Sequence, residues 1–165
     1  MKPTTSLLLQ IIIDTREQTP WHFPSHLAVV SRGTLDAGDY ALEGDNGFAV
    51  ERKSLNDFAG TTSTGWERFQ DELERMEQDF PARVIVVEGS IMQIVNHEYN
   101  HPKVTPQFLF KQIAILTMNG ISVLFADNPI TAAGLAYTIL KERSRQLEPD
   151  NNNNSDGREG DLPEA

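Results

Sequence analysis

The sequence of 165 residues predicts an α/β fold, with a mixed central β-sheet flanked by helices and a disordered acidic tail. Short apolar segments typical of strands occupy the first half of the chain, and strand and helix patterns alternate in the second half. From residue 149 onward there is almost no apolar content to fold around. We therefore expect one domain at residues 1–147 and a tail at residues 148–165.

Five segments have the composition of β-strands. An apolar run at 7–14 comes first, and two segments at 34–42 and 48–53 are predicted to form a hairpin around the Gly-Asp-Asn-Gly turn at 44–47. These three segments would form a β-meander. The β-branched run at 83–88 is typical of a buried strand, and residues 121–125 predict a shorter one.

Three helices are expected between and after these strands. One is indicated by apolar residues at spacings of three and four and ends at Pro81; its stripe consists of Trp66, Phe69, Leu73, Met76 and Phe80. Thr105-Pro106 and Asn128-Pro129 each resemble an N-cap followed by proline at the first helical position. These pairs predict helices to about residues 119 and 145, the first of them ending at Asn119-Gly120.

Composition narrows the class of protein. The chain has no cysteine, which excludes disulfides and thiolate metal sites. The apolar run at 7–14 is interrupted by Gln10 and lacks a small-residue cleavage site, so a strand is favoured over a signal peptide. No segment approaches the roughly 18 apolar residues of a membrane span. We therefore expect a soluble cytoplasmic protein with no membrane partner.

The net charge of −10 argues against non-specific coating of nucleic acid, which depends on neutralising phosphates with lysine and arginine. About half of this charge lies from Glu148 onward, where Arg158 is the one basic residue. The domain itself is therefore only moderately acidic.

Two short segments contain most of the candidate catalytic residues: Gly38-Asp39-Tyr40 and Val50-Glu51-Arg52-Lys53. In a strand at 48–53, Glu51 and Lys53 would share one face and Arg52 would point to the other. Asp39 would come from the adjacent strand. Two carboxylates beside an ammonium group suit a metal-dependent phosphodiester nuclease.

Magnesium prefers hard oxygen ligands and keeps several waters, so one or two carboxylates are sufficient. Asp39 and Glu51 are the first expected ligands of Mg²⁺ or Mn²⁺, and the backbone carbonyl of Arg52 and the Asp14 carboxylate are further candidates. Because lysine is a poor general base at neutral pH, we assign Lys53 to orienting the attacking water and stabilising charge on the phosphate. Arginines are candidates for binding the flanking phosphates: Arg16, Arg52 and Arg68.

Three consecutive charged residues also occur on ordinary solvated strand edges. A functional site is favoured here because Glu51 follows the apolar residues Phe48, Ala49 and Val50, and because Asp14 ends another apolar strand.

These residues resemble the nuclease domain of the XPF-type structure-specific endonucleases. The similarity rests on Ile-Asp-Thr-Arg-Glu at 13–17, Gly-Asp-Tyr at 38–40, Val-Glu-Arg-Lys-Ser at 50–54 and Asp57, and it extends over about residues 8–146. It continues through Trp-Glu-Arg-Phe-Gln at 66–70 and the strand at 84–88. Enzymes of this family carry a Gly-Asp…Glu-Arg-Lys-x-x-x-Asp signature on a restriction-endonuclease-like, or PD-(D/E)XK, fold.

The resemblance implies a metal-dependent DNA endonuclease that cuts branched or junction DNA in repair or recombination. Asp39 and Glu51 would bind Mg²⁺ or Mn²⁺, Lys53 would be catalytic, and other residues would line the site: Asp14, Glu17, Arg52, Asp57 and Arg68. Family members usually act as dimers with a tandem helix-hairpin-helix domain, which the polar tail does not match. We therefore expect a homodimer or a partner protein to supply DNA grip.

Three alternatives stand beside this hypothesis. His97-Glu98-Tyr99-Asn100-His101 matches the H-E-x-x-H zinc protease pattern, but Pro102 disfavours the helix that the pattern requires, and a surface loop is favoured. Trp21 and Phe23 could contact nucleic acid from a loop near the site. A non-catalytic DNA-binding or scaffolding member of the same fold is also possible, although Asp39, Glu51 and Lys53 are all present.

Overall fold

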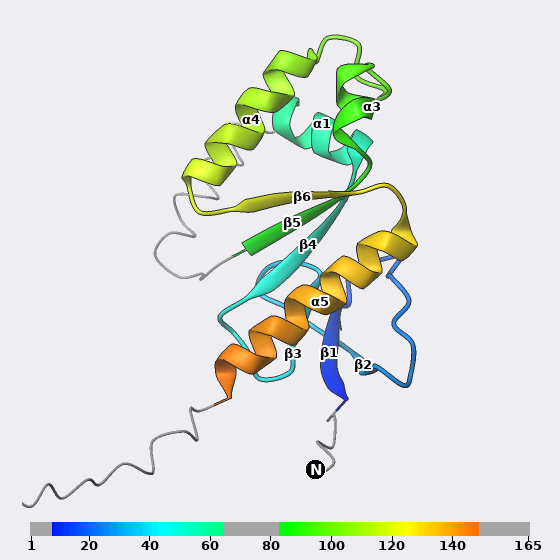
Figure 1. The fold of residues 1–165 in the computed structure, drawn as a ribbon, viewed down its shortest axis with the longest axis vertical. Helices are drawn as coiled ribbons and strands as arrows, with labels where there is room; N and C mark the ends of the chain where they lie inside the picture. Colours follow the sequence, from blue (N-terminus) through cyan, green and yellow to red (C-terminus); the bar gives the residue numbers. More distant parts are fainter. Residues whose placement is uncertain (1–7, 65–82, 149–165) are drawn as a thin grey trace, which may run out of the picture.

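A six-stranded mixed sheet forms the centre of the molecule in the computed structural model, which describes residues 8–64 and 83–148 (Figure 1). The spatial order of the strands is β2-β1-β3-β4-β5-β6. The strands are β1 Leu9–Asp14, β2 Ala28–Gly33, β3 Tyr40–Leu42, β4 Ala49–Ser54, β5 Arg83–Glu88 and β6 Ser122–Ala126. The expected sheet is thus confirmed.

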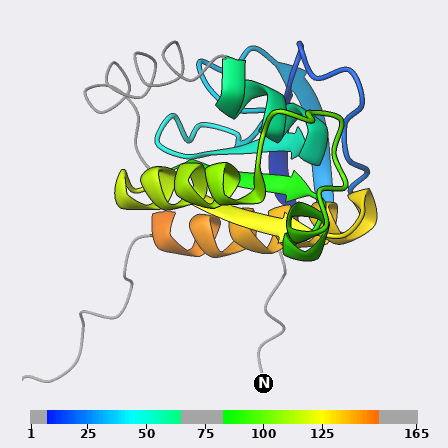
Figure 2. The same cartoon turned by 90° about the horizontal axis from the view of Figure 1, so that it is seen from above.

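Helices cover both faces of this sheet. The described helices are α1 Leu55–Thr64, α3 Ile91–Val95, α4 Pro106–Met118 and α5 Pro129–Leu147. Helix α5 packs alone on one face, against β3, β5 and β6, whereas α1, α3 and α4 gather on the other (Figures 1 and 2). The result is a three-layer arrangement of helix, sheet and helices.

The pairing of the strands changes direction at two places. Strands β1, β3 and β4 pair antiparallel, as predicted for the meander, and β4, β5 and β6 pair parallel. The parallel pairs place the ends of β4, β5 and β6 at the same edge of the sheet. Strand β2 pairs parallel to β1 and forms one border of the sheet.

Alternation along β5 divides the hydrophobic core in two. Val86 joins the cluster beneath α5, which includes Ile11, Tyr40 and Leu140. Ile85 and Val87 point the other way, into the cluster under α1, α3 and α4. A strand buried on both faces reads as a continuous β-branched run, which is why residues 83–88 were predictable.

The proline-opened helices begin where their caps indicate. The Thr105 side chain accepts a hydrogen bond from Phe108 N at 3.2 Å, and Asn128 accepts one from Thr131 N at 2.9 Å. Asn119 caps the end of α4, and Gly120 follows with φ +76°. The predicted starts and the stop are confirmed because each depends on contacts within a few residues.

The sequence-based boundaries are wrong at residues 34–39, which do not form a strand. Tertiary contacts hold this loop instead: Leu35 N donates to the Asp14 carboxylate at 2.8 Å, and Arg16 donates to Leu35 O at 2.9 Å. Strand β2 and helices α1 and α3 were not predicted. The exposed Ser-Arg-Gly end of β2 and the Gly-Thr-rich sequence of α1 give weak local signals.

The predicted helix over residues 66–80 and the acidic tail lie outside the described residues. Within residues 8–64 and 83–148, none of the helices has the length and apolar character needed to cross a membrane.

Gly38 is the residue on which the β3–β4 geometry most directly depends. Its φ is +74°, and an added Cβ would lie 2.7 Å from Ala49 Cβ. We expect Gly38→Ala to lower the free energy of unfolding by about 3 kcal/mol, through backbone strain and overpacking together. Urea unfolding would measure this change.

Gly44→Ala is the matched control, because Gly44 has φ +80° but nothing within 4 Å of the added Cβ. It should cost only the strain, about 1–2 kcal/mol. Equal losses in the two variants would show that crowding against β4 is unimportant.

Candidate active site

A cleft of about 260 Å³ opens on the face of the sheet opposite α5 and contains the three residues expected to be catalytic. Asp39, Glu51 and Lys53 all line it. The other lining residues are Arg16, Asp36, Ala37, Gly38, Thr61, Arg83, Ile85 and Ile121. The structure therefore brings the central motif together at one point.

Strand pairing places Asp39 beside β4. Asp39 N donates to Val50 O at 2.9 Å, so the residue continues the ladder that pairs Tyr40 with Val50. Its carboxylate oxygen Oδ2 then accepts a hydrogen bond from Arg52 N at 2.8 Å. This contact spans 13 residues and fixes the carboxylate against the middle of the Glu-Arg-Lys motif.

Alternation along β4 puts Glu51 and Lys53 on the cleft face, as predicted. Lys53 Nζ lies 3.0 Å from Glu51 Oε1, and both side chains are partly buried. The ammonium group thus lies within the cleft beside an acid. Its position suits contact with an anion bound between the side chains.

Asp39 has a perturbed carboxyl group. Burial raises its pKa to about 6, and the nearby charge of Glu51 acts in the same direction. The Arg52 N–H and the Lys53 charge oppose this rise but do not cancel it. Two acids in one shielded cleft repel each other, and a bound cation would relieve that repulsion.

Asp14 is fully buried and lies next to the cleft, not in it. Its two carboxylate oxygens accept four hydrogen bonds, from Arg16 N, Nε and Nη2 and from Leu35 N. The Arg16 guanidinium holds the pKa of Asp14 well below its usual range. Asp14 therefore anchors the loop and positions Arg16, whose side chain remains 69% exposed at the cleft.

Arg52 points to the α5 side of the sheet, as alternation predicts. Its guanidinium forms a bidentate pair with Glu88 at 2.8 and 3.1 Å, and it also donates to Glu17 Oε1 at 3.3 Å and Thr19 Oγ1 at 2.6 Å. These contacts place the Arg52 and Glu17 side chains away from the cleft. Neither residue lines the cleft through its side chain.

Trp21 and Phe23 are core residues, which corrects the alternative that they contact nucleic acid near the site. Both are buried; the Trp21 ring stacks on Tyr40 at 4.6 Å, and Phe23 meets Tyr40 edge-on. Trp21 Nε1 donates to Glu88 Oε1 at 2.6 Å, and Trp21 N donates to Tyr40 Oη at 2.8 Å. Trp21 therefore links the Arg52–Glu88 pair to the buried aromatic cluster.

Asp57, another predicted site residue, does not line the cleft. Its carboxylate accepts a hydrogen bond from Ser54 Oγ at 2.6 Å at the start of α1. Arg68 lies outside the described residues. The sequence analysis missed three residues of the cleft that belong to no motif: Asp36, Thr61 and Arg83. Of these, only Asp36 could have been suspected, because it lies close in sequence to the Gly-Asp-Tyr segment.

The H-E-x-x-H segment does not form a helix, as expected. Helix α3 ends at Val95, and His97 adopts a positive φ of 57°. Its ring stacks on Tyr99 and contacts the carbonyl of His101 at 3.3 Å. The two imidazoles therefore do not share a helical face, and the loop interpretation is confirmed.

The donor set of the cleft fits a hard divalent cation. Asp39 and Glu51 provide carboxylate oxygens, and among the described residues no group of three or more histidine or acidic side chains converges. This is fewer side chains than a calcium or zinc site requires, but it is enough for magnesium, which retains waters. Burial and the nearby charge of Glu51 raise the pKa of Asp39, and a bound cation would stabilise the charged form of this acid.

The fold and the cleft define the class of protein: residues 13–139 match the model of the ERCC4 domain, and the chain belongs to this family. Among solved structures, it is similar to XPF from Aeropyrum pernix, with TM-score 0.64, 23% identity, and coverage of 84% of this chain and 66% of that one. The structure of that protein in complex with DNA has TM-score 0.64, 24% identity, and coverage of 86% and 68%.

The expected XPF-type nuclease fold is thereby confirmed, and this chain spans about two thirds of the length of the archaeal structures. A comparison with curated proteins gives no match.

The raised pKa of Asp39 predicts a pH-dependent cost in stability. The folded pKa, about 6, exceeds the unfolded value of 3.8, so folding favours the protonated acid. Stability from this group is complete below pH 4 and is lost as pH rises through about 6. Asp39→Asn should therefore raise the free energy of unfolding at pH 7.5 by about 1–2 kcal/mol, a value reduced because the carboxylate is partly solvated.

Urea unfolding in EDTA at several pH values would test this expectation. The gain should shrink between pH 6 and pH 4, because the wild-type acid then takes up its proton. Glu43→Gln, which removes an exposed acid on the same hairpin, is the control for the loss of one negative charge. A gain for Asp39→Asn that is independent of pH would contradict the assigned pKa.

The Arg52–Glu88 pair predicts a large loss on truncation. Glu88→Ala leaves a guanidinium and the Trp21 indole without their shared acceptor, and should cost about 3 kcal/mol. Glu142→Ala removes the exposed pair with Arg145 and should cost less than about 1 kcal/mol. Thermal or urea unfolding compares the two, and similar losses would refute the structural role of Glu88.

Proposed function

We propose that this chain is a magnesium-dependent DNA endonuclease that hydrolyses phosphodiester bonds at branched or junction DNA in repair or recombination. The observation that carries the proposal is the convergence of Asp39, Glu51 and Lys53 on one cleft of an ERCC4 domain. The DNA-bound structure of the similar archaeal XPF supports DNA as the substrate.

The residues of the cleft have distinct roles in this proposal. Asp39 and Glu51, with the Arg52 carbonyl, would hold Mg²⁺ or Mn²⁺, which when bound supplies charge neutralisation and an acidified water. The Arg52 N–H keeps the Asp39 carboxylate aimed at the cleft. Lys53, whose Nζ lies 3.0 Å from Glu51 Oε1, would orient the attacking water and stabilise negative charge on the phosphate.

Cations around the cleft would bind the flanking phosphates. Arg16 lines the cleft with an exposed guanidinium that Asp14 holds in place, and Arg83 lies on the cleft wall. Arg52 and Glu17 contribute as supports of the carboxylates, because their side chains lie on the opposite face. This assignment replaces direct phosphate binding by the Arg52 side chain.

A second copy of the chain or a partner protein would supply further DNA grip. Three acids line the cleft together with its cations, and the chain as a whole is acidic, so electrostatic attraction to the phosphate backbone is weak. We therefore expect binding to junction DNA by the isolated chain to be weak.

The cleavage reaction tests the proposal through single substitutions. Asp39→Ala, Glu51→Ala and Lys53→Ala should each reduce magnesium-dependent cleavage of fork, flap and four-way DNA by at least about 100-fold. Glu43→Ala, outside the cleft, should leave it unchanged. Product analysis on denaturing gels measures cleavage, and calorimetric titration with Mg²⁺ should show binding by wild type but not by the double variant at Asp39 and Glu51.

Cleavage that survives substitution of Asp39 or Glu51 would overturn the assignment. DNA binding without any cleavage by the wild-type chain would favour the non-catalytic scaffolding alternative. The magnesium titration separates these cases, because a scaffolding protein has no need of the cation.

A further inference from the structure

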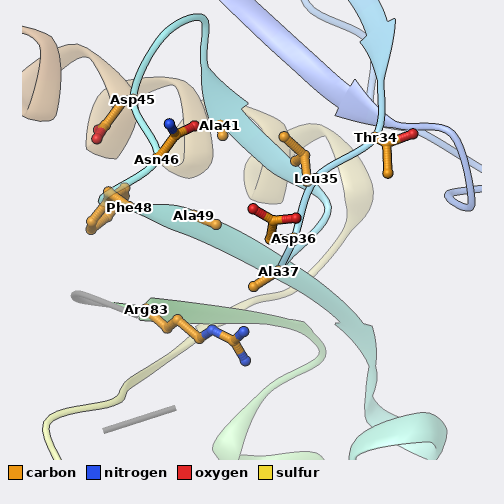
Figure 3. Close-up of a pocket in the computed structure, with 10 residues that line it drawn as sticks. All are labelled: Thr34, Leu35, Asp36, Ala37, Ala41, Asp45, Asn46, Phe48, Ala49 and Arg83. Atoms are coloured by element: carbon orange, nitrogen blue, oxygen red, sulfur yellow. The ribbon is translucent and has the colours of Figure 1, made fainter. Parts of the chain in front are cut away.

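A second hollow continues the catalytic cleft along the β3–β4 hairpin. It shares Asp36, Ala37 and Arg83 with the cleft, so the two hollows are neighbours. Figure 3 shows Asn46 and Phe48 on one side of the hollow, Leu35 and Asp36 on the other, and two alanines between them. Thr34 and Asp45 complete the lining.

Register explains why the hollow exists. Ala41 follows Asp39 by two residues and Ala49 precedes Glu51 by two, and both alanines line the hollow. Two residues of extended chain span about 6.6 Å. The small alanine side chains, which are buried, form the apolar floor of the hollow about one nucleotide step from the carboxylates.

The polar groups of the hollow favour a nucleobase over a phosphate. Asp45 is neutralised by Arg143, whose Nε lies 2.7 Å from Asp45 Oδ2, and Arg143 also covers the Phe48 ring. Asp36 is exposed at the shared edge, where its negative charge offsets the positive charge of Arg83 and weakens attraction for phosphate. A carboxylate accepts hydrogen bonds from exocyclic amino groups of bases, and the Asn46 amide can both donate and accept.

The size of the hollow limits what it can hold. Its volume of about 60 Å³ is enough for a few waters or for the edge of one base, but not for an entire flipped nucleotide. Leu35, Phe48 and the two alanines supply apolar contact for the ring. The hollow therefore suits a base edge presented by a splayed strand next to the cut.

We propose that this hollow is a base-reading subsite, which accepts the edge of the nucleobase adjacent to the scissile phosphate and favours bases with an exocyclic amino group. Asp36 is its main specificity-determining residue and Asn46 its second. The inference rests on the proposed nuclease function, and it adds a sequence preference that neither the family nor the catalytic residues imply.

Cleavage of matched junction substrates tests the subsite. Each substrate carries C, A, G or T at one position flanking the scissile phosphate, and the rates are compared as ratios. Wild type should cleave the C, A and G substrates about fivefold faster than the T substrate at one position. Asp36→Asn should reduce this ratio to about one, because an amide also donates to thymine O4, and Asn46→Ala should reduce it partially.

Glu43→Gln is the matched control: it makes the same change of charge on the hairpin but lies outside the hollow, and it should keep the wild-type ratio. Competition binding of the same oligonucleotides in Ca²⁺, followed by fluorescence anisotropy, provides a readout that does not require cleavage. Circular dichroism of each variant verifies folding.

The outcomes separate the two proposals. Cleavage with equal rates for all four bases, or an unchanged ratio in Asp36→Asn, overturns the subsite while leaving the nuclease intact. Absence of magnesium-dependent cleavage overturns the proposed function, and the binding ratios then decide the subsite by themselves. A preference lost equally in Glu43→Gln would also overturn it, because the effect would then be one of overall charge.

Discussion

The hydrogen bond from Arg52 N to the Asp39 carboxylate is the contact on which the candidate site depends. It joins two segments that are 13 residues apart and places one acid against the strand that carries the other. The side chain of the same arginine passes to the opposite face and pairs with Glu88. Arg52 thus connects Asp39 in the cleft to the buried aromatic residues on the other face of the sheet.

The two faces of the sheet carry different kinds of residues: one holds a hydrophobic core, and the other holds the candidate catalytic residues. The α5 face contains the Trp21–Tyr40 stack, the Arg52–Glu88 pair and a cluster of buried aliphatic residues. The cleft face holds two acids, and the pKa of Asp39 rises to about 6 because its carboxyl group is buried and Glu51 lies nearby. Folding therefore favours the protonated form of Asp39, and a cation bound at the acids would offset the cost of ionising it.

On the β3–β4 hairpin, the second hollow lies closer to the turn than the acids of the cleft do. Ala41 and Ala49 lie between the acids and the turn, and the loop at residues 34–37 forms the other wall. This loop is held by Asp14 and Arg16, which places the Asp-Thr-Arg-Glu segment in a supporting role and leaves the Arg16 guanidinium at the cleft. A DNA strand passing from the cleft to the hollow would meet the acids first and the smaller hollow next.

Local sequence determined the helix caps, the buried strand at 83–88, the β3–β4 hairpin and the shared face of Glu51 and Lys53, because each follows from contacts or alternation within a few residues. The order of the strand-forming segments also predicted the antiparallel pairing of β1 with β3. Tertiary structure alone decided the rest. It placed β2 beside β1, made residues 34–39 a loop held by Asp14, and buried Trp21. These features depend on contacts with residues that are distant in sequence, and a local sequence pattern does not reveal such contacts.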